Sequence, residues 1–397
     1  MTRIAVAAIS ARVLAEAAHA DGFHVDALDL FGDTDTRDAS ASWAPIGAPG
    51  SLHVDGERLL AGLAATARRG EALGWVAGSG FEGRADLLDA GAALLPLLGN
   101  GGACMRRVRT PQTFFAALDA AGVVHPEVRV DRPADRGDWL AKDAHGCGGW
   151  HIARVDAGAA QVDPGGAGSA GGQGRYFQRV AAGLPMSATF IADGMRAQVL
   201  GINELIVRPI AGRPYVYCGA VGPVAVAPSV SRQVRQALGA VAAEFGLRGL
   251  GSLDFMLDGD VLLVLEVNPR PPATLALYGD LRFGGGAQGV FAAHVRACVH
   301  GQLDEPVSLR PSGSALASAS ARGIETVFAR RAAHLDLPAV RRLASIAGAC
   351  DLPAAAFTVQ TGDPVCSVRT TGIDTASVRA QLDRAGHAVH SLLETSS

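Results

Sequence analysis

One lysine followed by a glycine-rich turn is the first feature of this sequence that could do chemistry. Lys142 is the only lysine among 35 basic residues, and it ends an apolar segment that begins at Trp139. Three of the four positions in the following turn, residues 146–149, are glycine. Glycines let backbone N–H groups approach phosphate oxygens closely, and an ammonium group supplies a point charge. The segment predicts a phosphate-binding loop, not of the Walker type because GxxxxGK[ST] is absent; a plain surface turn is the alternative.

Oxygen-bearing side chains follow a second apolar segment. Two apolar runs, residues 251–257 and 261–265, flank an Asp-Gly turn, which predicts a β-hairpin. Glu266 and Asn268 are two positions apart, so they share one face of the second strand about 7 Å from each other. Burying such polar side chains on an apolar strand costs free energy unless they find hydrogen-bond or metal partners. Hard oxygen ligands beside a phosphate site indicate Mg²⁺. A solvated strand end is the alternative, which the five apolar residues before Glu266 disfavour.

A third segment, residues 175–183, has the pattern of a strand that ends at a glycine. Its backbone groups could meet the edge of an adenine ring. Taken alone, the segment indicates an ordinary strand.

The elements that must position these residues indicate an α/β fold. In residues 1–100, strands and helices alternate, which favours a parallel sheet with its ligand-binding edge at the carboxyl ends of the strands. We expect residues 78–83 and 271–280 to face the substrate, with Tyr278 and Arg282 as candidate contacts. The elements expected near the start are strands at 3–9, 24–31 and 73–77, a helix at 56–69 and a loop at 38–50. Later expectations are a helix at 231–245, short strands at 325–329, 356–361 and 364–370, a helix at 375–393, and connectors at 164–174 and 309–323.

Composition excludes several classes of protein. The chain has 397 residues, 49% hydrophobic and 18% charged, which is enough apolar material for about two to four packed units. A formal net charge of −3 leaves no general excess of positive charge to bind nucleic acid or anionic membranes. No apolar run reaches the roughly 20 residues that span a bilayer. Six cysteines without a CxxC pair disfavour a disulfide framework and favour a reducing cytoplasm. The opening residues could be mistaken for a signal peptide, but we expect them to form the first strand.

Taken in order, the three segments resemble the ATP-grasp superfamily. The resemblance covers roughly residues 1–300, and its most specific part is Glu-Val-Asn-Pro-Arg at 266–270. It implies an N-terminal α/β domain before a two-lobed ATP-grasp domain, with a small α+β module at the end. The implied boundaries are 1–100 for the N-terminal, substrate-side domain, 101–180 for the lobe with the glycine-rich loop, 181–305 for the lobe with the metal site and 306–397 for the C-terminal module.

The resemblance implies a nucleotide site. Lys142 would contact the α- and β-phosphates of ATP, and the loop 146–149 would close over them. Relatives often carry another basic residue just before the helix that starts here at Thr110, and among Arg106, Arg107 and Arg109 we favour the last. The implied nucleotide-binding residues are Arg109, Lys142, Gly146, Gly148, Gly149, Gln178, Arg179 and Val180, the last three lining the adenine.

The resemblance also implies a metal site and a reaction. Asp254, Glu266 and Asn268 would hold two Mg²⁺ ions, with Glu266 bridging them; Mn²⁺ could substitute. A substrate carboxylate would attack the γ-phosphate of ATP to give an acyl phosphate and ADP, and an amine would then displace phosphate. Arg270 would stabilise the transferred phosphoryl group, and Lys142 would neutralise charge. The implied activity is that of an ADP-forming carboxylate–amine ligase.

The tail resembles the end of carboligase-like ATP-grasp proteins, in residues 351–353, 362–368 and the closing helix. Some of these occur with the furan- and pterin-linked one-carbon pathway, where a relative joins tyramine to glutamate. Coenzyme biosynthesis of the methylofuran or methanofuran type is therefore one expected setting. We expect small-molecule carboxylate and amine substrates, no nucleic acid and no membrane, and we leave a homodimer open. The alternatives are a carboxylase that uses bicarbonate with a separate biotin carrier, and a non-catalytic nucleotide-binding protein.

The register of the hairpin tests the metal site. Asp254 and Glu266 must lie on one face of the sheet to share a metal, and directly opposite residues share a face. A two-residue turn at 258–259 would place the two carboxylates on opposite faces. We therefore predict a three-residue loop at 258–260, which puts Asp254 opposite Val264, or a β-bulge with the same effect on parity.

Overall fold

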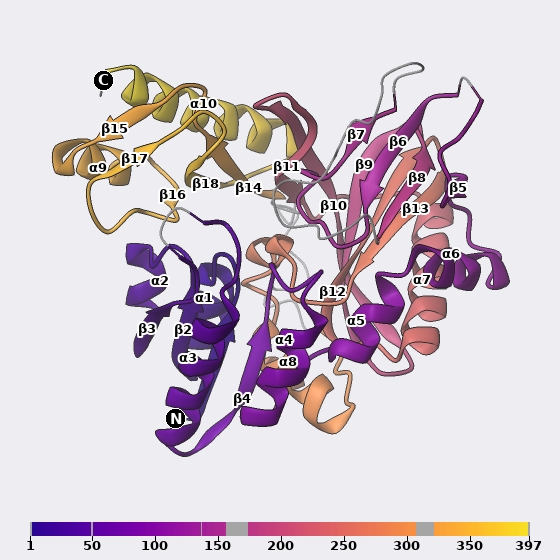
Figure 1. The fold of residues 1–397 in the computed structure, drawn as a ribbon, viewed down its shortest axis with the longest axis horizontal. Coiled ribbons are helices and arrows are strands. Elements are labelled where there is room, and N and C mark those ends of the chain that lie inside the picture. Colours follow the sequence, from indigo (N-terminus) through magenta and orange to yellow (C-terminus); the bar gives the residue numbers. More distant parts are fainter. Residues whose placement is uncertain (1, 49–50, 136, 156–173, 307–320, 396–397) are drawn as a thin grey trace.

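The computed structural model describes residues 2–48, 51–135, 137–155, 174–306 and 321–395 (Figure 1). Most of the two expected connectors, residues 164–173 and 309–320, lies outside these residues. The described chain has the expected mixed α/β fold, with the yellow C-terminal elements beside the indigo N-terminal ones and most strands from the middle of the chain on the other side of the molecule. In the described part of the chain, no helix combines the length and the apolar character needed to cross a membrane.

The N-terminal residues form a parallel four-stranded sheet of order β3-β2-β1-β4. Ile4 and Val6 pack into one core while Ala5 and Ala7 pack into another, so both faces are covered. A short edge strand lies inside the loop expected at 38–50; its four residues are too few to show an alternating pattern. The elements are β1 (Arg3–Ala7), α1 (Arg12–Ala20), β2 (His24–Asp29), α2 (Thr34–Asp38), β3 (Ser42–Pro45), α3 (Gly56–Arg68), β4 (Ala72–Ala77) and α4 (Ala85–Leu94).

A second four-stranded sheet, of order β5-β8-β6-β7, carries the lysine and the glycine-rich turn. Its strands pair antiparallel, and Lys142 lies opposite Tyr176 while Leu140 lies opposite Gln178. Its elements, with the two preceding helices, are α5 (Gly102–Val108), α6 (Pro111–Ala120), β5 (Val128–Arg129), β6 (Trp139–Asp143), β7 (Ala153–Arg154) and β8 (Arg175–Arg179).

An eight-stranded antiparallel sheet of order β13-β12-β9-β10-β11-β14-β18-β16 forms the largest layer. The helix expected at 231–245 is present and begins earlier, at Pro228, and its apolar stripe packs against Phe190 and Phe255 of the sheet. Helix α8 packs against β12 and β9 of this sheet and against α1, and its Phe291 joins the core that contains Ile4. The elements are β9 (Leu184–Asp193), β10 (Ala197–Ile210), β11 (Arg213–Gly222), α7 (Pro228–Phe245), β12 (Arg248–Asp258), β13 (Val261–Asn268), η1 (Ala273–Leu277), η2 (Gly284–Gly286) and α8 (Val290–His300).

Three C-terminal strands, β14, β18 and β16, continue this sheet, while β15 and β17 pair with each other in a separate two-stranded sheet. Strand β14 pairs with β11, with Gly219 opposite Glu325, and β18 and β16 follow it. The expected short strands and the closing helix are present, and the divisions at residues 100, 180 and 305 stay predictions. The elements are β14 (Ala321–Phe328), β15 (Ala333–Leu335), α9 (Leu337–Ala344), β16 (Ala349–Cys350), β17 (Phe357–Val359), β18 (Pro364–Gly372) and α10 (Thr375–Glu394).

Candidate functional site

The lysine of the glycine-rich segment is buried. Lys142 is 3% exposed, and its Nζ donates a 3.0 Å hydrogen bond to Oε1 of Gln178. The register of β6 and β8 puts both side chains on one face of their sheet, and Nζ also lies 5.8 Å from the ring centre of Tyr176. A buried ammonium group with so few partners differs from the exposed lysine of a plain surface turn.

The carboxylates of the hairpin share one face, as predicted, by a different route. The turn has two residues, Gly259 and Asp260, between Asp258 and Val261, so the predicted three-residue loop is wrong. A β-bulge just after Asp254 shifts the register by one residue, which is the alternative we allowed. As a result Asp254 lies directly opposite Glu266 rather than opposite Val264, and Ser252 lies opposite Asn268.

Asp254 is held by neutral donors and faces a second carboxylate. Ser187 Oγ donates to its Oδ1 at 2.8 Å, and Asn268 Nδ2 donates to its Oδ2 at 2.9 Å. Burial and the charge of Glu266 raise the pKa of Asp254 to about 6. The raised pKa of Asp254 means that nearby positive groups do not offset its burial and the charge of Glu266, and a hard divalent cation bound there would do so.

Arg109 comes closest to this donor set. It caps the end of α5 and is 7% exposed; its Nη2 donates to Asn268 Oδ1 at 2.7 Å, and its Nη1 lies 3.4 Å from Glu266 Oε2. Burial alone would raise the pKa of Glu266, but Arg109 and Lys142 outweigh burial and lower it. The two other candidates point outward, Arg106 to Asp89 and Arg107 to Glu244.

Arg270 is paired with a carboxylate that the sequence did not single out. Arg270 Nε donates to Glu82 Oε1 at 2.9 Å, and Glu82 Oε2 accepts the backbone N–H of Gly80 at 2.8 Å. Glu82 is 3% exposed; burial would raise its pKa, but Arg270 and Arg109 lower it. The loop 78–83 therefore reaches the end of β13 through this ion pair. Its glycines and its position had predicted a substrate-facing loop, but no local signal named the glutamate.

Of the three residues expected at the adenine, only Gln178 has its side chain beside Lys142. The side chain of Arg179 forms ion pairs with Glu127 and Asp135 and is 40% exposed. The backbone N–H of Val180 donates to Asp138 O at 2.9 Å. Side chains alternate along a strand, so Gln178 and Arg179 must face opposite ways. The expectation that Gln178, Arg179 and Val180 line the adenine stays a prediction, and for Arg179 it would depend on the backbone rather than on the side chain.

The glycines of the loop permit close packing. Gly148 O accepts a 2.9 Å hydrogen bond from the N–H of Tyr217 on β11, and a Cβ on Gly149 would collide with the carbonyl oxygen of Tyr215. Gly148 and Gly149 have φ of 65° and 79°, in the left-handed region that favours glycine. A Cβ on Gly146 would collide with the ring of His151. The loop therefore rests on β11 of the neighbouring sheet.

Cys147 in the same loop is not an activated thiol. The charge of Glu82, together with burial, raises its pKa to about 12. A thiol with a raised pKa is a poor nucleophile near neutral pH, so we assign Cys147 the role of a small loop residue.

Several buried polar atoms around these residues have no hydrogen-bond partner in the described part of the chain. They are Arg109 Nε, His151 Nδ1, Gln178 Nε2 and the hydroxyl of Tyr217. Native proteins pair most buried polar groups, so a group of unpaired atoms at one place indicates that a ligand completes it. Burial lowers the pKa of His151 to about 4 and raises that of Tyr217. Neither residue stands out in the sequence: His151 directly follows the glycine-rich turn but is a lone histidine, and Tyr217 lies in a segment without a motif.

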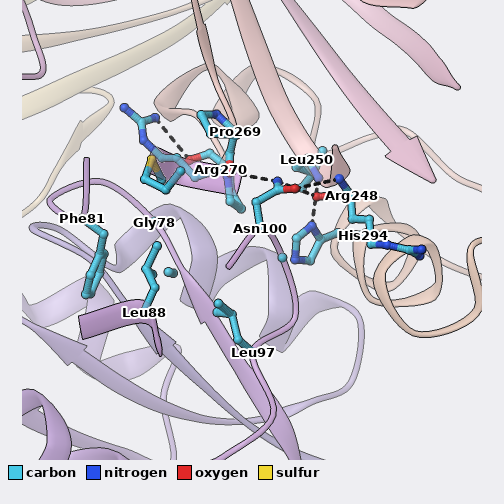
Figure 2. A pocket seen from close by; sticks show the side chains of 14 residues that line it. Gly78, Phe81, Leu88, Leu97, Asn100, Arg248, Leu250, Pro269, Arg270 and His294 are labelled. Atoms are coloured by element: carbon cyan, nitrogen blue, oxygen red, sulfur yellow. Dashed lines mark hydrogen bonds between the residues drawn. The ribbon is translucent and has the colours of Figure 1, made fainter. Parts of the chain in front are cut away.

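Behind the site, Asn100 ties the segment that precedes α5 to the start of β12 and to the residue that follows β13 (Figure 2). Its Nδ2 donates to Pro269 O at 3.0 Å and to Arg248 O at 2.9 Å, while its Oδ1 accepts the N–H of Arg248. A cavity of about 10 Å³ beside it is bordered by Arg270 and His294. That volume has room for about one water molecule. It is a gap at the contact between two sheets, and Asn100 positions the segment that carries Arg270.

Comparison with known proteins agrees with this geometry. Residues 112–274 match the family model of the ATP-grasp domain, in agreement with the resemblance that the sequence indicated. A segment of 83 residues is 39% identical to the large chain of carbamoyl phosphate synthase from Kocuria rhizophila, and one of 53 residues is 43% identical to that of Micrococcus luteus. These matches span 21% and 13% of this chain but only 7% and 5% of the relatives.

Solved structures share the fold over almost the whole chain. An L-amino acid ligase from Bacillus licheniformis aligns with a TM-score of 0.65 at 12% identity, covering 98% of both chains. A carboxyaminoimidazole ribonucleotide synthase from Aspergillus clavatus, complexed with ATP, aligns with a TM-score of 0.66 at 15% identity, covering 98% of this chain and 99% of the other. An ADP complex of N5-carboxyaminoimidazole ribonucleotide synthetase aligns with a TM-score of 0.65 at 14% identity, covering 98% and 96%. At these identities the likeness establishes the α/β fold alone.

Proposed function

We propose that this protein is an ATP- and magnesium-dependent, ADP-forming ligase that joins a carboxylate to an amine. The observation that carries the proposal is the meeting, in one buried place, of Lys142, Arg109 and the face that bears Asp254 and Glu266. The unpaired donors Arg109 Nε and Gln178 Nε2 lie in the same group. The match to the family model of the ATP-grasp domain, and relatives whose names describe ligases and synthases, support it.

ATP would lie between the sheet of β6 and β8 and the strand β13. Lys142 and Arg109 would neutralise the phosphates, and the unpaired amide of Gln178 would meet the nucleotide beside them. The loop 146–149, resting on β11, would cover the phosphates and exclude water, which would protect an acyl phosphate from hydrolysis.

Asp254, Glu266 and Asn268 fit Mg²⁺, since they bring carboxylate and amide oxygens to one face and since the pKa of Asp254 is raised by burial and by the charge of Glu266. Bound there, the ions would neutralise charge on the phosphoryl group that is transferred. The neutral donors Ser187 and Asn268 hold the carboxylate of Asp254 in position for this role.

The reaction would run in two steps. A carboxylate oxygen of the acid would attack the γ-phosphorus, and the bond to the β-phosphate oxygen would break to release ADP. The amine nitrogen would then attack the carbonyl carbon of the acyl phosphate, lose a proton, and expel inorganic phosphate. Arg270, oriented by its ion pair with Glu82, would stabilise the charge on the phosphoryl group in both steps.

A bicarbonate-using carboxylase is the second candidate. The structural relatives include both an L-amino acid ligase and carboxyaminoimidazole ribonucleotide synthases, at nearly equal TM-scores. A biotin carrier would have to be a separate protein, because biotin attaches to lysine and the only lysine here is Lys142. For the carboxylate–amine ligase, the narrower proposal is a role in coenzyme biosynthesis of the methylofuran or methanofuran type.

ADP release with Mg²⁺ tests these proposals. A screen of acids and amines, with tyramine plus glutamate and bicarbonate alone among its conditions, should give ADP and phosphate only when a carboxylate and an amine are both present. Release that needs bicarbonate would favour the carboxylase. Stoichiometric AMP and pyrophosphate would mean adenylation and would overturn the proposal, and binding of ATP without turnover under any condition would leave a non-catalytic nucleotide-binding protein.

A further inference from the structure

A buried histidine beside the glycine-rich loop has no part in the ligase scheme above. His151 follows the loop 146–149, lies just before β7, and is 9% exposed. Its Nδ1 is buried and finds no hydrogen-bond partner among the described residues. Burial of an unpaired imidazole nitrogen costs free energy, so a partner outside the chain would have to repay it.

A second buried histidine shows how this chain treats an imidazole that serves packing. His294 is 1% exposed; its Nδ1 accepts the N–H of Leu250 at 2.9 Å, and its Nε2 lies 3.1 Å from Leu98 O. Both nitrogens of that ring are occupied. The unpaired nitrogen of His151 is therefore not the normal state of a buried histidine in this molecule.

The surroundings of His151 indicate the missing partner. Its ring lies against Gly146, where any side chain would collide with it. The charged groups that act most strongly on the ring are Glu266, Lys142 and Arg109, which are the groups assigned above to the metal and the phosphates. The nitrogen is thus among residues suited to phosphate oxygens.

We infer that His151 binds the phosphate chain of ATP, its Nδ1–H donating to an oxygen of the β- or γ-phosphate. The inference rests on the proposed function, since it needs ATP in this site. A neutral imidazole adds a donor without adding a further positive charge between Lys142 and Arg109, and its fixed ring on Gly146 gives that donor one direction. The residue is then a nucleotide-binding residue that distinguishes di- and triphosphates from monophosphates.

Nucleotide affinities measured by calorimetry with Mg²⁺ test this. His151→Phe keeps a ring of similar size and should weaken ADP and ATP binding about tenfold or more, as for a lost hydrogen bond to a charged group. It should change the affinity for AMP by less than about twofold, because AMP has no β-phosphate. His151→Asn keeps an N–H near the position of Nδ1 and should restore most of the ADP affinity. His145→Phe is the matched control, since His145 lies in the same segment with its side chain 47% exposed.

Wild-type protein provides a second measurement that does not depend on the folding of a variant. The ¹⁵N resonance of His151 Nδ1 should shift when ADP binds and stay in place when AMP binds. Unchanged ADP affinity in His151→Phe, equal weakening of ADP and AMP, or an unmoved resonance would each overturn the inference while leaving the ligase proposal intact. Failure of the wild type to bind any adenine nucleotide would instead remove the proposed function, and this inference with it.

Discussion

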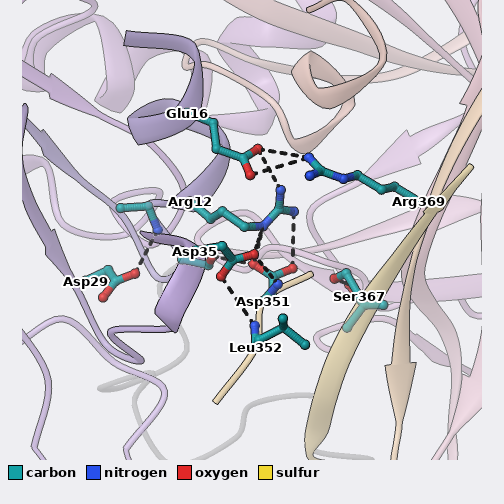
Figure 3. Close-up of polar contacts among 11 residues, drawn as sticks. Arg12, Glu16, Asp29, Asp35, Asp351, Leu352, Ser367 and Arg369 are labelled. Atoms are coloured by element: carbon teal, nitrogen blue, oxygen red, sulfur yellow. Dashed lines mark hydrogen bonds and ion pairs between the residues drawn. The ribbon is translucent and has the colours of Figure 1, made fainter. Parts of the chain in front are cut away.

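Two buried clusters of charged side chains in this molecule differ in how completely they are paired. At the nucleotide site, Arg109 Nε, His151 Nδ1 and Gln178 Nε2 are buried without partners in the described chain. At the junction between the N-terminal sheet and the C-terminal residues, Arg12 is 2% exposed and each of its nitrogens donates to a carboxylate (Figure 3). Asp351 accepts from Nε at 2.7 Å and from Nη2 at 3.2 Å.

The backbone completes that junction. The N–H groups of Asp351 and Leu352 donate to the carboxylate of Asp35, and the N–H of Thr34 donates to Leu352 O at 2.8 Å. Asp351 has φ of 54°, an uncommon conformation for a residue other than glycine, which these bonds hold in place. The comparison teaches that a guanidinium that joins two parts of the fold is fully paired within the chain, whereas the cluster proposed to receive a ligand leaves several donors unpaired.

The largest expected effect comes from removing charge at the incomplete cluster. Lys142→Ala should lower ATP turnover by about 10³-fold or more, because phosphoryl transfer depends on such charges. Circular dichroism should show a folded protein. ATP should also protect the wild-type protein from lysine-directed modification, whose only side-chain target is Lys142. An unchanged turnover rate would break the assignment of this cluster as the phosphate site.

Arg12→Ala should have the opposite profile. It leaves Asp351 buried without its partner, so the free energy of unfolding should fall by about 3 kcal/mol or more in urea titrations. The rate of ADP release per folded molecule should stay within about twofold, because Arg12 takes no part in the reaction we propose. The control is Arg196→Ala, which breaks the ion pair between Asp193 and the 75% exposed side chain of Arg196. This change should lower the free energy of unfolding by less than about 1 kcal/mol. Equal losses in the two variants would contradict the view of Arg12 as a structural joint.

Glu82→Gln should give an intermediate effect, since Glu82 belongs to the site but is already paired. The amide keeps a hydrogen-bond acceptor for Arg270 and loses the charge that orients it. We expect a fall in kcat of about tenfold, with KM for ATP within about twofold, because the pair would act on the transferred phosphoryl group. A rise in KM with unchanged kcat would place Glu82 in ATP binding instead.

The smallest effect concerns Asp33, the least satisfied member of the junction. Burial, then the charges of Asp351, Asp29 and Asp35, raise its pKa from 3.8 to about 8. A carboxyl whose pKa is higher in the folded state binds its proton more tightly there, so stability should fall as pH rises from about 4 to 8. Asp33→Asn should raise the free energy of unfolding at pH 8.5 by about 1 kcal/mol and leave it unchanged at pH 4. The same gain at both pH values would show that charge is not the cause.

Much of this fold could be predicted because its signals are local. The strand–helix alternation of residues 3–77, the apolar stripe of α7 and the hairpin around residue 259 are each visible within one short window of sequence. The strand β3 was missed because three half-buried residues and an exposed proline show no alternation of apolar and polar side chains. The pairing of β11 with β14 was out of reach, because about 100 residues separate the two strands.

The residues of the candidate site also divide into those with a local sequence signal and those without one. Lys142, Glu266 and Asn268 stand in short segments whose residue types already indicate phosphate and metal. Glu82 could not be named, because its partner Arg270 lies 188 residues away in the chain. His151 was missed because a lone histidine carries no signal until its burial and its unpaired nitrogen are known. A β-bulge was predicted only as one of two ways to place Asp254 and Glu266 on the same face of the sheet.

The pairing of β11 with β14 has a consequence for how this protein can vary. If the residues after 320 were removed, β11 would become the edge of the sheet and would present a row of unpaired N–H and C=O groups, an invitation to aggregation. The same cut would also take away Asp351 and leave Arg12 exposed to solvent. The C-terminal residues therefore cannot be removed or exchanged as a separate unit. New substrate preferences would have to arise by changes in the loops that border the site.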